Sequence, residues 1–346
     1  MSDTQHRTEN ANREAYMRFQ EEVFNGHDFS VETLAKHLTA DFIDHTAGPH
    51  AVPGVEGVAQ RLLAWHSAFG DARKDSVAIL AENDMVAVLY DIHAVHTGPL
   101  KGIEATHNNV VIPGIEIFRY QDGKASDYWS IYDYLSTAAE IGARLSLLPF
   151  VEGDGLADFL EQDVYRGIVH QERRKHNVFA KDSTDEEVIQ NKQTLRRFQE
   201  EVFNGHDWRV ETLAKHLTPD FVDHAAGPGD TPGLEGVSER FTIWQSAFDD
   251  AMEENMAMVG QEDMLAVLYD LHAVHRGDFI GVSATNRNVV IPGIEMLRFR
   301  DGKIAEHWGI YDFEATAAEI GARMVFTPLP EGDWKDKRSV RVELAN

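Results

Sequence analysis

Apolar residues recur at helical spacing in three stretches near the start of the chain. In the first stretch, Tyr16, Phe19 and Val23 fall on one face of a helix. The second stretch follows Ser30, a residue type that often caps helices, and the third follows a Pro-Gly turn. These patterns predict helices over residues 14–24, 31–38 and 54–69.

The following stretch changes to strand patterns, rich in β-branched and aromatic residues. Its spacing predicts strands over residues 42–46, 74–82, 85–97, 106–120 and 124–134. Asp122-Gly123 is a two-residue hairpin signal between the last two strands, and a final helix is predicted from Ser136. Helices grouped ahead of antiparallel strands indicate an α+β domain, in which helices cover one face of a curved sheet.

The chain contains this pattern twice. Residues 18–144 align without a gap with residues 197–323, at a constant offset of 179 positions. Long blocks such as RFQEEVFNGHD, VETLAKHLT, VVIPGIE and TAAEIGAR occur in both copies. Solenoid repeats are much shorter, about 20–50 residues, so this pattern indicates a duplicated domain.

The predicted organisation has four parts. Residues 1–150 form the first domain and residues 151–183 form a linker, whose apolar residues recur at helical spacing. Thr184-Asp-Glu-Glu187 is a capping-box pattern that begins the second domain, over residues 184–330. Residues 331–346 form a charged tail.

Composition restricts the partners and the chemistry. The chain has 58 acidic and 32 basic residues, a net charge of −26, which disfavours nucleic acid and anionic membranes as partners. It has no cysteine, which excludes disulfides, thiolate nucleophiles and zinc–thiolate sites. The first residues lack the apolar core of a signal peptide, and no apolar run reaches the roughly 18 residues of a membrane span, so we expect a cytoplasmic protein.

A carboxylate at the end of the last predicted strand is the first candidate for chemistry. Strand parity places Asp133 on the same face as Trp129 and Ile131, and Asp312 on the same face as Trp308. Burial among apolar side chains would raise the pKa of such a carboxyl group and suit it to acid–base work. The alternative is an aspartate that caps the following helix or pairs with an arginine.

Histidines provide further candidates. His45 and His224 each follow an aspartate on a short strand, so only one residue of each pair can face inward. His96 and His275 lie three positions after another histidine on the longest strand, so the two rings face opposite ways and do not form a metal clip. No metal site and no cofactor is therefore predicted, and HExxH, Walker A, GxGxxG and GxSxG motifs are absent from the sequence.

The sequence pattern favours structural roles for two other sets of residues, a charged pair on a strand and a tryptophan on the third helix of each copy. Glu116 and Arg119, three apart on a strand, face opposite ways and suggest cross-strand ion pairs on each face. Trp65 and Trp244 fall on the third helix of each copy, where they either pack in the core or form a pocket wall.

The ordered motifs resemble those of SnoaL-like polyketide cyclases, in the nuclear transport factor 2-like superfamily. They include Phe-Asn-Gly-His, Asp-Phe-x-Asp-His, Pro-Gly-x-Glu-Gly, Gly-Ile-Glu and Trp-x-x-x-Asp, and they cover nearly all of both copies. The resemblance implies two tandem cone-shaped domains, each a curved sheet wrapped over three helices around a pocket. It also implies pairing through the sheets, which the tandem chain could supply as an internal pseudo-dimer, with a further homodimer as an alternative.

The resemblance also implies roles for individual residues. Asp133 and Asp312 would be the acid–base groups, without metal or cofactor, assisted by His45 or His96 and their counterparts. Residues expected to contact the substrate are Trp129, Trp308, Tyr90, Tyr269, His107, His307, Trp65 and Trp244. The family usually has histidine before the tryptophan; copy two keeps His307, whereas copy one has Tyr128. This divergence suggests either two pockets of different preference or one active pocket with a structural partner.

The resulting hypothesis is a cofactor-independent enzyme that transfers protons on a small carbonyl or polyketide-like compound. The step would be an aldol cyclisation, an isomerisation or a lyase reaction. Two alternatives remain: a non-catalytic ligand-binding or assembly module, and epoxide hydrolysis or dehydration in the same pocket. The first hypothesis predicts that changing Asp133 and Asp312 together to asparagine removes turnover.

Overall fold

The structure is a computed structural model that describes residues 3–48, 51–151, 183–227 and 230–330. The predicted linker helix, apart from its two end residues, and the tail of residues 331–346 lie outside the described residues. The domain boundaries at these points therefore stay predictions. Within the described residues, no helix combines the length and the apolar character that crossing a bilayer requires.

Both repeats have helices followed by strands, in the predicted order. Repeat 1 contains α1 (Asp3–Phe19), the π-helical turn η1 (Gln20–Asn25), α2 (Val31–His37), β1 (Leu38–Asp44), α3 (Gly54–Ala68), β2 (Phe69–Glu82), β3 (Met85–His96), β4 (Asn109–Gln121), β5 (Lys124–Tyr132), α4 (Tyr134–Glu140) and β6 (Ala143–Pro149). Repeat 2 contains α7 (Glu186–Phe198), η2 (Gln199–Phe203), α8 (Val210–His216), β7 (Leu217–Asp223), α9 (Gly233–Ala247), β8 (Phe248–Gln261), β9 (Met264–His275), β10 (Asn288–Arg300), β11 (Lys303–Tyr311), α10 (Phe313–Glu319) and β12 (Ala322–Pro328).

Local sequence explains several boundaries. Ser30 Oγ accepts a hydrogen bond from the backbone N–H of Thr33 and so begins α2. Asp122 and Gly123 both have positive φ, 51° and 80°, which is the backbone geometry of the predicted type I′ hairpin. One difference is that β2 begins at Phe69, immediately after α3, rather than at residue 74.

Each repeat forms one five-stranded sheet, in the order β1-β5-β4-β3-β2 or β7-β11-β10-β9-β8. The neighbours are antiparallel except for β1, which runs parallel to β5, and its counterpart β7 beside β11. Register shifts within β2, after Gly70 and after Ser76, interrupt its pairing with β3. Such bulges increase the twist and bend of a sheet, which allows it to curve around the helices. The predicted α+β fold is confirmed.

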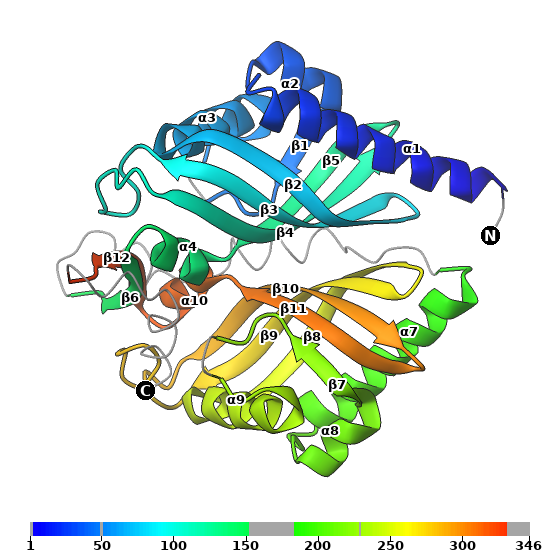
Figure 1. Ribbon diagram of the computed structural model, residues 1–346, viewed down its shortest axis with the longest axis vertical. Helices are drawn as coiled ribbons and strands as arrows, with labels where there is room; N and C mark the ends of the chain where they lie inside the picture. Colours follow the sequence, from blue (N-terminus) through cyan, green and yellow to red (C-terminus); the bar gives the residue numbers. More distant parts are fainter. Residues whose placement is uncertain (1–2, 49–50, 152–182, 228–229, 331–346) are drawn as a thin grey trace.

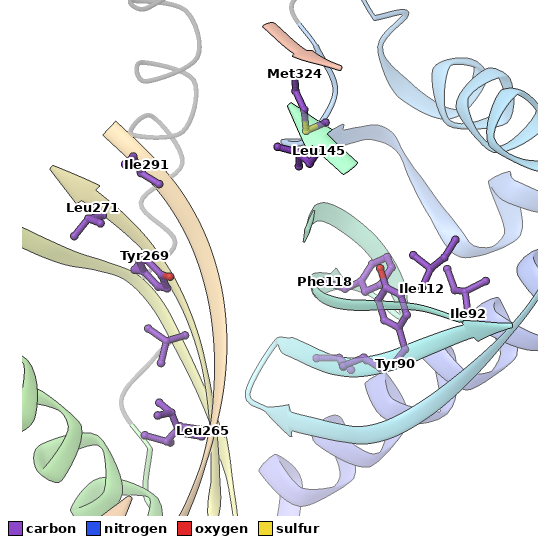
Figure 2. Close-up of a cluster of buried hydrophobic side chains, with 14 of the residues drawn as sticks. Tyr90, Ile92, Ile112, Phe118, Leu145, Leu265, Tyr269, Leu271, Ile291 and Met324 are labelled. Carbon is purple, nitrogen blue, oxygen red and sulfur yellow. The ribbon is translucent and has the colours of Figure 1, made fainter. Parts of the chain in front are cut away.

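One face of each sheet packs against the helices of its own repeat (Figure 1). Because these side chains are almost completely buried, they form the core that holds helices and sheet together. Figure 2 shows part of this core, with Tyr90, Ile92, Ile112 and Phe118 in repeat 1 and Leu265, Tyr269, Leu271 and Ile291 in repeat 2.

The opposite faces of the two sheets pack against each other. In Figure 1 the sheets lie in the middle of the molecule and the helices α1–α3 and α7–α9 lie outside. The layer between the sheets is apolar and buried, and comprises Leu80, Met85, Ala87, Leu89, Ile115, Ile117, Trp129, Ile131, Ala257, Val259, Met264, Ala266, Leu268, Ile294 and Met296. The two repeats therefore pair through their sheets as an internal pseudo-dimer.

A second contact between the repeats is a two-stranded antiparallel sheet of β6 and β12, which the sequence analysis did not predict. In its register Leu145 is opposite Phe326 and Leu147 is opposite Met324. Leu145 and Met324 lie on these two strands in Figure 2, beside the cores of both repeats. Each repeat thus supplies one strand that only the other repeat can pair.

A buried ion pair also crosses between the repeats. Lys192 Nζ, on α7, lies 2.8 and 2.7 Å from the two carboxylate oxygens of Glu82, at the end of β2. The backbone N–H of Gly260 donates a further hydrogen bond of 2.7 Å to Glu82. In the other direction, the backbone N–H of Ala81 donates to the side-chain oxygen of Gln261, the counterpart of Glu82.

Candidate functional site

The cone of each repeat encloses a cavity between helices and sheet. The repeat-1 cavity has a volume of 410 Å³. Repeat 2 has an inner cavity of 190 Å³ and, adjoining it, an outer cavity of 690 Å³. Trp244, Arg240 and Tyr311 line both repeat-2 cavities, so the two cavities lie side by side.

A buried carboxylate lies at the centre of the repeat-1 cavity. Glu116, on β4, is completely buried, and Lys74 Nζ donates to its two oxygens at 2.9 and 2.8 Å. The hydroxyl groups of Tyr16 and Tyr128 donate to the same carboxylate at 2.8 and 3.2 Å. Burial, and the negative charge of Glu116, raise the pKa of Tyr16 well above its usual value, so this hydroxyl stays a donor. Both carboxylate oxygens are therefore occupied.

The equivalent place in repeat 2 has different chemistry. The counterpart of Glu116 is Glu295, but the counterpart of Lys74 is Glu253, so an ammonium group is replaced by a carboxyl group. Burial, and then the charge of Glu295, raise the pKa of Glu253 well above its usual value. The raised pKa favours the protonated form of Glu253, which can therefore act as an acid beside Glu295.

His307 replaces Tyr128 beside this carboxyl pair. Its Nε2 lies 3.3 Å from Glu295 Oε2 and its Nδ1 lies 3.0 Å from Asp223 Oδ1. Burial alone would lower the pKa of His307, but Asp223 and Glu295 outweigh it and raise the pKa to about 10. Asp223 is held in turn by Arg240 at 2.6 Å. His307 is therefore a positioned cation at neutral pH.

A small neighbour makes room for the imidazole ring. A Cβ atom at Gly309 would lie 2.7 Å from two ring atoms of His307. The equivalent position in repeat 1, beside Tyr128, is Ser130. The histidine and the glycine thus occur together in repeat 2.

The raised pKa of His307 makes the stability of the protein depend on pH. Unfolded histidine titrates near pH ~6.5, so the stabilisation from protonated His307 is complete below that pH and is lost as the pH rises toward about 10. We expect the melting temperature of the native chain to exceed that of H307Q most below pH ~6.5, and the difference to shrink steadily up to about pH 10. Thermal melts across this range measure it. A difference that stays constant with pH would contradict the assignment.

The Asp-His pairs differ between the repeats: Asp44 and His45 both line the repeat-1 cavity, whereas in repeat 2 Asp223 lines the inner cavity and His224 lines neither cavity. Arg61 binds Asp44 at 2.7 Å. His45 stacks on Trp129, with ring centroids 4.3 Å apart, and pairs with Asp127 at 3.0 Å. In repeat 2, His224 stacks in the same way on Trp308 and pairs with Glu306 at 2.9 Å.

The second set of histidines is buried away from these cavities. Neither His96 nor His275 is among the residues that line the three cavities. His96 Nδ1 accepts a hydrogen bond from the backbone N–H of Thr106 at 3.2 Å, and its Nε2 has no hydrogen-bond partner among the described residues. Burial lowers the pKa of both imidazoles, which keeps them neutral. His107, which follows Thr106 in the chain, is exposed.

Asp133 and Asp312 begin helices. Asp133 Oδ1 accepts a hydrogen bond of 2.8 Å from the backbone N–H of Ser136 and caps α4, and Asp312 caps α10 through Ala315 at 2.9 Å. Asp133 is not among the residues that line the three cavities, whereas Asp312 lines the repeat-1 cavity across the contact between repeats. The capping alternative raised by the sequence is thus present in the structure, and the catalytic role of the two aspartates stays a prediction.

The apolar face of the last strand lies between the two sheets. Trp129 does share a face with Ile131, but this face packs in the layer between the two sheets. The cavity side of β5 carries Tyr128, Ser130 and Tyr132. Trp308 likewise packs against the inter-sheet layer.

The remaining predicted contact residues lie at the cavities or just behind them. Trp65 lines the repeat-1 cavity, Trp244 lines both repeat-2 cavities and Tyr269 lines the inner one. Tyr90 is completely buried, with its ring 4.3 Å from Lys74 Nζ and its hydroxyl 3.2 Å from Ser130 Oγ.

Sequence reasoning missed the polar groups at the centre of each cavity. Glu116 does form an ion pair between strands, with Lys74 of β2, but this pair lies at the cavity inside the cone, which the sequence analysis did not predict. A signal was present: Lys74 and Glu253 are a charge reversal at equivalent positions of two otherwise very similar copies. Among the described residues, no group of three or more histidine, aspartate or glutamate side chains is placed to hold a metal ion.

Comparison with known proteins assigns the family. The family model for SnoaL-like polyketide cyclases matches residues 14–141 and 193–320, one match in each repeat. The chain therefore belongs to the SnoaL-like polyketide cyclase family, with two tandem domains. No curated protein matches the chain.

Solved structures resemble one repeat at a time. A putative SnoaL-like polyketide cyclase from Jannaschia sp. CCS1 is 19% identical, with a TM-score of 0.36, over 41% of this chain and 98% of that one. IdmH, a putative polyketide cyclase from Streptomyces antibioticus, is 31% identical, with a TM-score of 0.34, over 38% and 99%. AclR, a putative hydroxylase from Streptomyces galilaeus, is 25% identical, with a TM-score of 0.34, over 39% and 97%.

Proposed function

We propose that repeat 2 is an acid–base catalyst that acts on a small carbonyl compound, by aldol-type cyclisation or by isomerisation. The observation that supports this most directly is the carboxyl pair Glu253 and Glu295 beside the cation His307, at the wall of an enclosed cavity. Membership of the cyclase family is consistent with this chemistry.

The geometry suggests a role for each group. The Glu295 carboxylate would take a proton from the carbon next to the carbonyl group, and the freed electron pair would move onto the carbonyl oxygen as an enolate. Glu253, protonated because of its raised pKa, would donate its proton to that oxygen. The His307 cation, fixed by Asp223, would stabilise the negative charge as it develops. For cyclisation, the nucleophilic carbon of the resulting enol would then attack a second carbonyl of the same molecule. The enol O–H proton would return to Glu253, and the new alkoxide would take the proton held by Glu295.

Asp133 and Asp312 stay in the proposal as candidates. Asparagine caps helices as well as aspartate does, so the D133N/D312N variant should keep its fold and its melting temperature. A loss of turnover in this variant would therefore report chemistry, and retained turnover would leave both residues as caps. His45, which lines the repeat-1 cavity and stacks on Trp129, and His224, which stacks on Trp308, also stay candidates.

A generic proton-abstraction substrate tests the proposed function without knowledge of the natural one. In nitrobenzisoxazole a base removes one carbon-bound proton while the ring N–O bond breaks, and the product is a coloured cyanonitrophenolate. We expect saturable turnover that depends on pH through the carboxyl pair. Turnover no faster than in acetate buffer at equal carboxylate concentration would argue against a catalytic base in the chain.

A further inference from the structure

We propose that the repeat-1 cavity is a second, non-catalytic site that binds an uncharged aromatic compound. This inference rests on the proposed function of repeat 2, because it assigns the two cavities of one chain to different tasks. It follows from three features: the state of the Glu116 carboxylate, the lining of the cavity, and the helix that closes it.

The first feature is that Glu116 has no capacity left for proton transfer. It accepts two hydrogen bonds from Lys74 and one each from Tyr16 and Tyr128, and it is completely buried. A substrate proton could reach it only if the ion pair with Lys74 were broken in the protein interior, which is costly. In repeat 2 the residue equivalent to Lys74 is the acid Glu253. Glu295 therefore has no counterpart of the lysine that neutralises Glu116.

The divergence extends to a set of positions. Repeat 1 has Lys74, Tyr16, Tyr128 and Ser130, whereas repeat 2 has Glu253, Leu195, His307 and Gly309. In repeat 1, Lys74, Tyr16 and Tyr128 donate hydrogen bonds to Glu116. Ser130 follows two positions after Tyr128 and hydrogen-bonds to Tyr90. The change therefore replaces one complete hydrogen-bonding arrangement by another.

The second feature is the cavity that remains. At 410 Å³ it is more than twice the 190 Å³ of the inner cavity, and it lies within the range of about 300–1,000 Å³ typical of small-molecule sites. Its lining is rich in rings, including Phe19, Phe24, Phe42, Trp65, Phe118 and Tyr132. Flat aromatic side chains favour a flat aromatic ligand through stacked or edge-to-face contacts.

The charged groups of the lining already have partners. Asp44 is bound by Arg61 at 2.7 Å, and Glu314 is bound by Lys101 at 2.8 Å. Asp312 caps α10. Together with the pair of Lys74 and Glu116, these contacts engage the charged groups of the lining, which favours a ligand without charge.

The third feature is that repeat 2 completes the cavity. Asp312, Glu314 and Ala315, at the start of α10, line the repeat-1 cavity. Phe313 and Thr316 of the same helix line the outer cavity of repeat 2. Figure 1 shows α10 beside α4, at the end of the molecule where β6 and β12 pair. The site is thus a property of the tandem chain, and one helix lines both the binding cavity of repeat 1 and the outer cavity of repeat 2.

Matched cavity-filling variants of the full chain test the inference. Leu62 on α3 lines the repeat-1 cavity, and its counterpart Phe241 on α9 lines the inner cavity. The probe is N-phenylnaphthylamine, an uncharged aromatic compound whose fluorescence rises when it enters an apolar site. We expect L62W to weaken its tightest binding by about tenfold or more, because the added ring occupies the cavity, and F241W to leave it unchanged. V58F, at a second lining position, repeats the test if L62W does not fold.

A second variant separates this inference from the proposed function. E253K/H307Y places the repeat-1 residues in repeat 2. We expect nitrobenzisoxazole turnover to fall by about 10²–10⁴-fold while the probe still binds.

If turnover survives in E253K/H307Y and disappears in L62W, catalysis lies in repeat 1 and the inference is overturned, although the acid–base function stands. If the unmodified chain shows no turnover, the proposed function fails, and the probe titrations still decide whether repeat 1 binds. Equal probe affinity in L62W and the unmodified chain would overturn the binding site.

Discussion

Replacing Lys192 with methionine is expected to lower the free energy of unfolding by about 3–5 kcal/mol. The Glu82 side chain is only 3% exposed, and Lys192 is the cation that neutralises it. Without Lys192 the carboxylate would keep the hydrogen bond from the backbone N–H of Gly260, but it would remain an unneutralised charge inside the protein. Because the two residues belong to different repeats, the loss should weaken the pairing of the sheets as well as α7.

Urea denaturation of the full chain measures this effect, and the pseudo-symmetry provides a control. The counterpart of Lys192 is Arg13, and the counterpart of Glu82 is the uncharged Gln261, so R13M leaves no buried charge behind. We expect R13M to change stability by about 0.5 kcal/mol or less. The double variant E82Q/K192M should recover part of the loss, because it removes the unpaired charge together with its partner. If K192M and R13M lowered the free energy of unfolding equally, the ion pair between Lys192 and Glu82 would not be a specific source of stability.

Much of the fold could be predicted because its determinants are local or repeated. The helices before the sheet, the hairpin at Asp122-Gly123 and the duplication all follow from spacing and from residues close in sequence. The pairing of β6 with β12 could not be predicted in this way. Both strands follow the TAAEIGAR block at the end of a repeat, and only the contact between the repeats brings them together.

The candidate site was harder to predict for a related reason. Strand parity correctly grouped Trp129 with Ile131, but parity does not say which face of a strand is concave. In this protein both faces are buried, one by helices and one by the other repeat, so apolar side chains occur on both. The pairing of Lys74 with Glu116 joins residues 42 positions apart on different strands, and neither residue has a local motif around it.

Replacing Glu295 with glutamine is expected to reduce turnover of the proton-abstraction substrate by about 10²–10⁴-fold. Glutamine has nearly the same shape and still offers an oxygen to His307 Nε2, so the cavity and the histidine keep their geometry. It cannot accept the substrate proton, however. The pKa of Glu253 should also fall, because the negative charge that helps to raise it is gone.

The control for this prediction lies one position along β8 from the pair. Glu254 follows Glu253, but its side chain is 62% exposed and binds His272 at 3.2 Å, on the opposite face of the strand. E254Q also removes one carboxylate charge, but outside the cavity, on the strand that carries Glu253, so we expect unchanged turnover. The pH dependence adds a second readout: the native profile should contain a step from the carboxyl pair that E295Q lacks and E254Q keeps. If E295Q and E254Q lose turnover equally, the effect is one of overall charge, and the base must be sought elsewhere, with Asp312 at the repeat-1 cavity as the next candidate.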